Sequence, residues 1–396
     1  GCEGPCQKID LGAPSVGRAQ VDFSRYVAVG TSISSGYQSG GLVNRHQIAG
    51  FPAIFARQIG KTVLLDGTGS FSEPTVDGNG IPPLYFLQGL YPAPDIARLP
   101  GGPGSPTNAT YAAPYSNLAV PGAILFDLGN PARYANGYFP LVLRGQGTIQ
   151  QQLLLQQPTF ISFEFGANEV LGAASSGSAK VYAPPTDPGT FAALLQGAVQ
   201  AIHSAVPDAR MAIANVPNVT TIPYFTTIPP TGLWGKVHRV VQAPSPNVGR
   251  DTIRVAALSS GDLVLLPAGP QLAHGVGFSA SSPLDSTLVL DEAERTAIGN
   301  AVTLLNAAID QIATAPWVAK VDLNGKLQEI HQRGYSVGGT FYTDRFISGG
   351  LFSLDGIHPT DLGHAILANA MIEAVNRRFG TSVPYARCLN YASPSS

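Results

Sequence analysis

The sequence has few charged residues, few cysteines and no long apolar run. Asp, Glu, Lys and Arg make up 12% of its 396 residues and the net charge is −2, whereas about a quarter of an average soluble domain is charged. The basic surface of a nucleic-acid-binding protein is therefore missing, and we expect no nucleic-acid partner. No apolar run approaches the roughly 20 residues of a membrane-spanning helix.

Motifs for metal binding are missing as well. The sequence has no H-E-x-x-H motif and no cysteine pair typical of zinc. Five histidines are scattered without ligand spacing: His46, His203, His238, His274 and His331. We expect no metal and no other cofactor.

Only three cysteines are present, namely Cys2, Cys6 and Cys388. Cys2 precedes a low-complexity lead to about Gln20, and it resembles the lipid-modified cysteine of a processed bacterial lipoprotein. A Cys2–Cys6 or Cys2–Cys388 disulfide is an equal alternative, and lipid on Cys2 with a Cys6–Cys388 disulfide would use all three cysteines. We expect a secreted, periplasmic or cell-surface protein of the bacterial envelope, with residues 1–20 as a possible membrane tether.

Glycine and proline are abundant, at 45 and 33 residues, and 44% of the chain is apolar. Runs typical of buried strands alternate with apolar residues at helical spacing. Strands are expected at 25–30, 62–66, 159–165, 210–216 and 317–322, and helices at 48–59, 148–155, 187–206, 291–312 and 360–378. This order predicts an α/β fold with a five-stranded parallel sheet between helices. Residues 21–380 would form one domain with loop insertions at about 67–115 and 217–288, followed by a C-terminal tail at 381–396.

Polar residues follow two of these strands and precede the last helix. Ser32 follows the first strand, Asn168 follows the third, and Asp355 and His358 lie just before the last helix. A serine hydroxyl needs a base to become a nucleophile, and that base is usually a histidine oriented by a carboxylate. An asparagine amide can stabilise a developing oxyanion. Taken alone, the Gly30-Thr31-Ser32 stretch is equally well explained as a turn that ends a strand.

In this order, the residues resemble the four sequence blocks of the SGNH (GDSL-like) hydrolases. The blocks match residues 30–36, 117–122, 166–169 and 355–359, and the resemblance spans roughly 25–378. It implies a flavodoxin-like three-layer α/β/α fold and ester hydrolysis through an acyl-enzyme, without a metal. Carried over position by position, it implies a triad of the nucleophile Ser32, the base His358 and its partner Asp355. The implied oxyanion hole consists of Ser32, Gly122 and Asn168.

Two positions depart from the family pattern. Thr31 stands where the family usually has aspartate, and Glu169 stands where the third block usually ends in aspartate. Neither position supplies the nucleophile, the base or an oxyanion donor, so hydrolysis remains the expectation. The alternative is a protein of the same fold that has lost its chemistry and serves as a binding or structural module on the cell surface.

Two other motifs resemble catalytic patterns. Residues 334–338 match G-x-S-x-G, but a polar stretch precedes Ser336 where an α/β-hydrolase needs a buried strand. Asp361 and His364 repeat the D-x-x-H spacing inside the expected last helix, where a packed helical histidine is the better interpretation.

The two insertions connect elements that end near the expected active face. We expect them to wall the substrate cleft with some of their aromatic residues: Tyr85, Phe86, Tyr111, Tyr224, Phe225 and Trp234. A small-molecule, lipid or polymer ester would suit such a cleft. The sequence gives no indication of the oligomeric state.

Overall fold

The computed structural model describes residues 21–89, 94–177, 183–230, 240–242 and 254–392. Its central sheet is parallel and has the strand order β1-β4-β5-β10. These strands are β1 (Tyr26–Val29), β4 (Phe160–Phe163), β5 (Arg210–Ala214) and β10 (Val318–Val321). Residues 116–120 continue the sheet beside β1, where the Ala28 N–H donates to Ser116 O at 2.8 Å and the Leu118 N–H to Ala28 O at 2.8 Å.

Residues 62–66 do not form the strand that the sequence predicted. Leu64 and Leu65 are 47% and 52% exposed, whereas Leu118 and Val120 are fully buried. The Thr62 N–H donates to the Ser70 hydroxyl at 2.8 Å, within a local loop. The place beside β1 is taken by the segment whose apolar side chains can be buried there.

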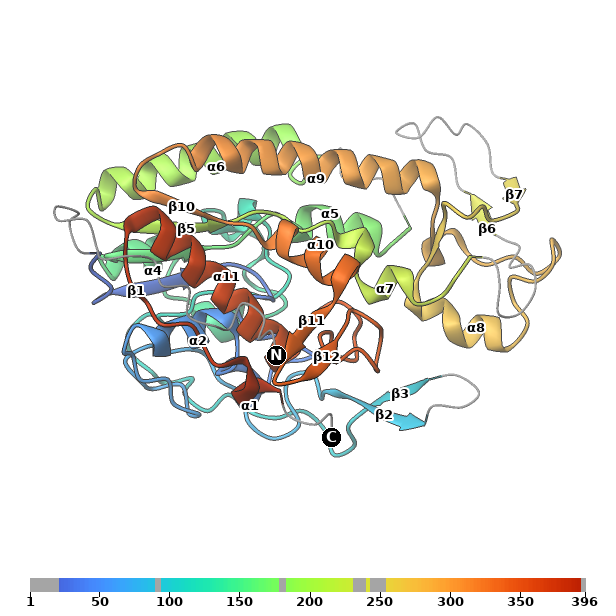
Figure 1. The fold of residues 1–396 in the computed structure, drawn as a ribbon, viewed down its shortest axis with the longest axis horizontal. Helices are drawn as coiled ribbons and strands as arrows, with labels where there is room; N and C mark the ends of the chain where they lie inside the picture. The colour runs from blue at the N-terminus through green and yellow to red at the C-terminus, as the bar shows by residue number, and fades with distance from the viewer. Residues whose placement is uncertain (1–20, 90–93, 178–182, 231–239, 243–253, 393–396) are drawn as a thin grey trace.

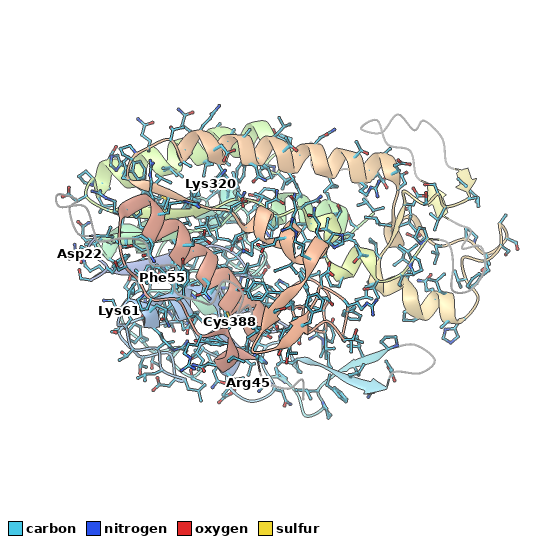
Figure 2. All side chains as sticks on the ribbon, viewed as in Figure 1. Asp22, Arg45, Phe55, Lys61, Lys320 and Cys388 are labelled. Atoms are coloured by element: carbon cyan, nitrogen blue, oxygen red, sulfur yellow. The ribbon has the colours of Figure 1, made fainter. Side chains whose placement is uncertain are left out.

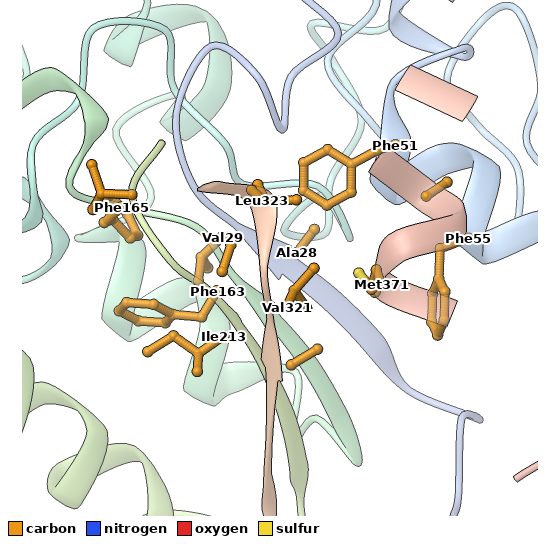
Figure 3. Packing of buried hydrophobic residues seen from close by; sticks show 14 of the residues in the cluster. Ala28, Val29, Phe51, Phe55, Phe163, Phe165, Ile213, Val321, Leu323 and Met371 are labelled. Atoms are coloured by element: carbon orange, nitrogen blue, oxygen red, sulfur yellow. The ribbon is translucent and has the colours of Figure 1, made fainter. Parts of the chain in front are cut away.

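Helices cover both faces of the sheet, so the protein is a three-layer α/β/α structure (Figure 1). One layer contains α2 (Phe51–Gln58) packed against α11 (Asp361–Phe379), together with α10 (Leu323–Arg333). The other contains α4 (Ile149–Leu155), α6 (Pro188–Ala205) and α9 (Glu292–Ile312). Figure 3 shows Phe51, Phe55 and Met371 on one side of the sheet and Phe163, Phe165 and Ile213 on the other.

The helix starts follow their capping signals. The Asp187 carboxylate accepts the Thr190 N–H at the start of α6, with Pro188 in the first turn. Asp291 and Glu294 form a capping box at the start of α9. These local hydrogen bonds satisfy amide groups that a helix leaves open at its N-terminus.

The remaining elements are short. They are α1 (Asn44–Gln47), α3 (Phe139–Leu143), α5 (Ala167–Ala174), α7 (Pro223–Thr226), α8 (Gly269–Ala273), and the antiparallel pairs β2 (Tyr85–Gly89) with β3 (Asp95–Arg98), β6 (Val240–Gln242) with β7 (Arg254–Ala256), β8 (Leu263–Val264) with β9 (Val289–Leu290), and β11 (Tyr335–Val337) with β12 (Thr340–Tyr342). The described part of the second insertion, including α7, α8 and the β6–β7 pair, lies at one end of the molecule (Figure 1).

The end of the described chain packs onto α11. The side chains of Asn369 and Asn376 bind the backbone of Ala386 and Val383, and Cys388 is buried beside Asn369. Figure 2 shows Cys388 and Phe55 among packed side chains and the exposed Asp22 at the edge. Cys2, Cys6 and the predicted tether lie outside the described residues. Among the helices that are described, none has the length and apolar character needed to cross a bilayer.

Candidate active site

Ser32, His358 and Asp355 form one hydrogen-bonded line. The distance from Ser32 Oγ to His358 Nε2 is 2.8 Å, and that from His358 Nδ1 to Asp355 Oδ2 is 2.9 Å. Ser32 lies in the turn that follows β1, and Asp355 and His358 lie in the loop before α11. The structure therefore joins residues 326 positions apart in the order that the sequence predicted.

The Asp355 carboxylate is held from several sides. Oδ1 accepts the backbone N–H groups of Ile357 at 2.9 Å and His358 at 2.8 Å, and Oδ2 accepts that of Gly40 at 2.9 Å. Burial alone would raise the pKa of Asp355, but the neighbouring His358 and the hydrogen bonds from His358 and Ile357 outweigh burial and lower it to about 2. Asp355 is therefore ionised at neutral pH and fixes the orientation of the imidazole ring.

Asn168 and Gly122 lie on neighbouring turns. Asn168, in the first turn of α5, donates from Nδ2 to Ala123 O at 2.8 Å, which leaves the second N–H of its amide available. Gly122 has a φ of +79°, a conformation that favours glycine. Within the described chain, the N–H groups of Ser32 and Gly122 have no hydrogen-bond acceptor. All three are donors of the kind that an oxyanion requires.

Glu164 is a site residue that the sequence interpretation missed. It directly follows β4 and is buried, and its carboxylate accepts the Thr31 N–H at 3.0 Å, the Thr31 hydroxyl at 3.0 Å and the Ser34 hydroxyl at 2.9 Å. Burial raises its pKa, while these hydrogen bonds act in the opposite direction. The sequence signal was a single charged residue in the otherwise uncharged run at 159–165, which we interpreted only as a strand.

The carboxylate of Glu164 fits because residue 30 is glycine. A Cβ atom on residue 30 would lie 2.5 Å from Ser34 Oγ and 2.9 Å from Glu164 Oε2. Gly30 therefore allows the strand end, the serine turn and the glutamate to approach each other closely. Thr31 donates two hydrogen bonds to this carboxylate, from its backbone N–H and from its hydroxyl.

Two further buried glutamates hold the loops behind the site. Glu169 accepts the Leu125 N–H at 2.7 Å, which ties the start of α5 to the turn after Gly122. Asn117 donates to Ser34 O at 3.0 Å and to Glu73 at 3.3 Å. Burial raises the pKa of Glu169 to about 7 and that of Glu73 to about 8.

A cavity of about 800 Å³, including its open mouth, begins at Ser32, Asn168 and His358. The second insertion contributes Pro217, Val219 and Ile222 to its wall, but none of the described residues of the first insertion lines it. The expected aromatic wall is wrong for this cavity, because none of the five described candidates lines it: Tyr85, Phe86, Tyr111, Tyr224 and Phe225. Trp234 lies outside the described residues.

Residues of both insertions instead support the loops of the site. Tyr85 packs closely on Gly40, and Arg98 donates to Gly40 O at 3.0 Å and stacks on the Tyr85 ring. The Tyr224 N–H donates to Gly356 O at 2.9 Å. Both insertions therefore contact the backbone beside Asp355.

The two other catalytic-like motifs are not joined to this site. Ser336 is exposed on β11, opposite Phe341 of β12, so the G-x-S-x-G motif lies in a β-hairpin. His364 is completely buried in α11, and neither ring nitrogen has a hydrogen-bond partner in the described chain. Among the described residues, no group of three or more His, Cys, Asp or Glu side chains is placed to hold a metal ion.

Comparison with known proteins gives one family and several structures. The model of the GDSL-like lipase/acylhydrolase family matches residues 26–371. A GDSL-like lipase candidate from Parabacteroides merdae is 10% identical, with a TM-score of 0.40 over 90% of this chain and 99% of that one. The extracellular lipase of Streptomyces rimosus is 14% identical, with a TM-score of 0.36 over 88% and 98% of the two chains. Phospholipase A1 of Streptomyces albidoflavus is 15% identical, with a TM-score of 0.34 over 89% and 98%. No curated protein matches significantly.

Proposed function

Because the chain belongs to the GDSL-like lipase/acylhydrolase family, we propose that it hydrolyses carboxylic esters with Ser32 as nucleophile. The observation that carries this proposal is the hydrogen-bonded line Ser32–His358–Asp355 at the mouth of a cavity. A protein kept only for binding has no need of this alignment, so the inactive module is the less favoured alternative.

The first half of the reaction forms an acyl-enzyme. Ser32 Oγ attacks the ester carbonyl carbon while His358 Nε2 accepts its proton. The negative oxygen of the tetrahedral intermediate is stabilised by the N–H groups of Ser32 and Gly122 and by the amide of Asn168. When the intermediate collapses, the alkoxide leaves with the proton from His358, and the acyl group stays on Ser32.

Water completes the cycle. It attacks the acyl carbon and gives a proton to His358, the tetrahedral intermediate forms again, and Ser32 regains its proton as the carboxylic acid leaves. Asp355 keeps Nδ1 of His358 protonated and stabilises the imidazolium in both halves. No step requires a metal ion or an organic cofactor.

The test is hydrolysis of p-nitrophenyl acetate by wild type, Ser32→Ala and the exposed control Ser336→Ala. We expect Ser32→Ala to lower kcat at least about 10⁴-fold and Ser336→Ala to leave it unchanged. Wild-type hydrolysis that survives Ser32→Ala would refute the mechanism. Loss of hydrolysis in Ser336→Ala instead would assign the reaction to the hairpin serine.

The location in the bacterial envelope stays a prediction. Mass measurement of the unreduced native protein distinguishes lipid on Cys2 from a disulfide at that residue. Three free thiols without a lipid adduct would contradict both.

A further inference from the structure

The turn that carries Gly122 is not held by side-chain packing. The Ala123 N–H donates to Val120 O at 3.0 Å, and the two central residues are Pro121 and Gly122, which a type II turn favours. A Cβ atom on residue 122 would meet nothing within 4 Å outside its chain neighbours, so none of the described residues packs against this position. Glycine also has more backbone freedom than any other residue. The direction of the Gly122 N–H must therefore be fixed by hydrogen bonds around the turn.

Arg133 supplies one of these hydrogen bonds. Its Nη2 donates to Gly122 O at 3.2 Å, and its Nη1 donates to Asp127 Oδ2 at 2.7 Å. The same carboxylate oxygen accepts the Ile124 N–H at 2.9 Å. One guanidinium group, carried on the short 3₁₀ helix Pro131–Arg133, therefore joins the carbonyl of Gly122 to the carboxylate that holds the end of the turn.

Three buried carboxylates hold the turns of the site: Asp127, Glu164 and Glu169. Burial is the main cause of the raised pKa of Glu169, and the charges of Glu164 and Asp127 raise it further, so the three groups lie within electrostatic reach of one another. Any of them that is ionised opposes negative charge on a substrate oxygen nearby. The pair of Arg133 with Asp127 is the one ion pair that these carboxylates make in the described part of the chain.

We propose that Arg133 is a positioning residue of the oxyanion hole. Its hydrogen bond to Gly122 O holds the turn that presents the Gly122 N–H, and its positive charge offsets that of Asp127 while the oxyanion is present. This inference rests on the proposed function and adds a residue outside the triad. Arg133 does not line the cavity, whose wall includes residues of α5, α10 and α11.

The geometry requires an arginine at this position. The two acceptors, Gly122 O and Asp127 Oδ2, are bound by two different nitrogens of one planar group. A lysine ammonium carries the same charge but presents it from a single atom on a flexible stem. Lysine at position 133 should therefore keep one of the two contacts, and only part of the function.

The first test is steady-state hydrolysis of p-nitrophenyl butyrate by Arg133→Ala and Arg133→Lys. A displacement of about 1 Å in a catalytic group can cost about 100-fold in rate, so we expect Arg133→Ala to lower kcat about 10- to 100-fold. KM should change little, because Arg133 does not line the cavity. Arg133→Lys should give an intermediate kcat.

Arg144→Ala is the matched control. Arg144 also donates to backbone carbonyl groups, those of Tyr111 and Ala113, and lies over the ring of Tyr115. Its contacts are of the same kind as those of Arg133 but hold a loop of the first insertion. We expect Arg144→Ala to keep the wild-type kcat.

Guanidinium ion provides a readout that a merely structural role would not move. The side chain of Arg133 is 46% exposed, so the ion can enter from solution the place that Arg133→Ala leaves empty. Millimolar guanidinium chloride should restore part of the lost kcat in Arg133→Ala, whereas sodium chloride at the same ionic strength should not. A kcat lost through general damage to the fold would not recover with the ion.

The double variant Arg133→Ala/Asp127→Asn tests the contribution of charge. An asparagine oxygen can still accept the Ile124 N–H, and no buried carboxylate is left without its counter-charge. The double variant should therefore have a higher kcat than Arg133→Ala alone. A kcat no higher than that of the single variant would overturn the role assigned to the charge.

Wild-type kcat in Arg133→Ala would overturn the inference, as would a loss of kcat that guanidinium does not restore. In both cases the Ser32-dependent hydrolysis of the wild type would still support the proposed function. Absence of Ser32-dependent hydrolysis in the wild type would instead refute the proposed function, and this inference with it.

Discussion

Replacement of Glu164 tests whether a carboxylate from β4 holds the nucleophile turn in place. Three donors converge on this side chain: the Thr31 N–H, the Thr31 hydroxyl and the Ser34 hydroxyl. In Glu164→Ala all three lose their acceptor inside the protein. A buried donor without a partner costs about 1–3 kcal/mol, so the loss of stability should be roughly 3 kcal/mol or more.

The effect on catalysis follows from the position of Thr31 next to Ser32. A shift of about 1 Å in a catalytic group can cost about 100-fold in rate. We expect Glu164→Ala to lower kcat about 10- to 100-fold while KM changes little, because Glu164 does not line the cavity. Steady-state kinetics on p-nitrophenyl butyrate, together with urea unfolding, measure both effects.

Glu164→Gln is the matched control. The amide oxygen can take the place of Oε2, which accepts both the Thr31 N–H and the Ser34 hydroxyl, and the amide nitrogen can donate to the Thr31 hydroxyl. Glutamine should therefore restore most of the lost activity. The reasoning is refuted if Glu164→Ala keeps full kcat, or if glutamine is as damaging as alanine, since the negative charge itself would then be needed.

Two further predictions concern ionisable groups. Asp355→Asn should lower kcat about 10⁴-fold with little change in KM, because the imidazole loses the acceptor that fixes its tautomer; near wild-type kcat in steady-state assays would contradict this. Burial raises the pKa of Glu169 to about 7 and that of Glu73 to about 8, so the folded protein favours their protonated forms. The resulting contribution to the free energy of unfolding is fully present below their usual pKa near 4.5 and is lost as the pH rises through 7 to 8. Urea unfolding at pH 5 and pH 8 should show a decrease in the free energy of unfolding, and the decrease should be smaller in Glu169→Gln. An equal decrease in wild type and in Glu169→Gln would exclude Glu169 as a source of the pH dependence.

Much of the framework was predictable because its signals are local. The capping residues of α6 and α9 lie within three positions of the amides that they satisfy, and the four strands of the sheet are short apolar runs. Which segment of the chain lies beside β1 was not predictable from such local signals. Residues 62–66 and 116–120 each contain a short apolar stretch, and only tertiary burial decides which of them lies beside β1.

The cavity wall illustrates a second limit. Helix α10 was not predicted, because its polar residues obscure a narrow stripe formed by Leu323, Leu327 and Ile330. The spacing of four and three residues is the helical signal that could have revealed it. Conversely, aromatic residues in long loops indicated a wall, whereas the ring of Tyr85 packs on Gly40 and the backbone N–H of Tyr224 donates to Gly356.

The most informative departure from the family pattern is Thr31, and the sheet explains how it is accommodated. Strands β1 and β4 are parallel neighbours, and Val29 pairs with Phe163, so the residues that follow them emerge at the same edge. A carboxylate at position 164 can therefore reach the backbone and hydroxyl of residue 31 directly. The nucleophile turn in this chain thus has a buried acidic group that comes from the adjacent strand instead of the residue before the serine. A sequence comparison confined to the first block would count Thr31 as a loss, whereas the structure places the acidic group 133 residues further along the chain.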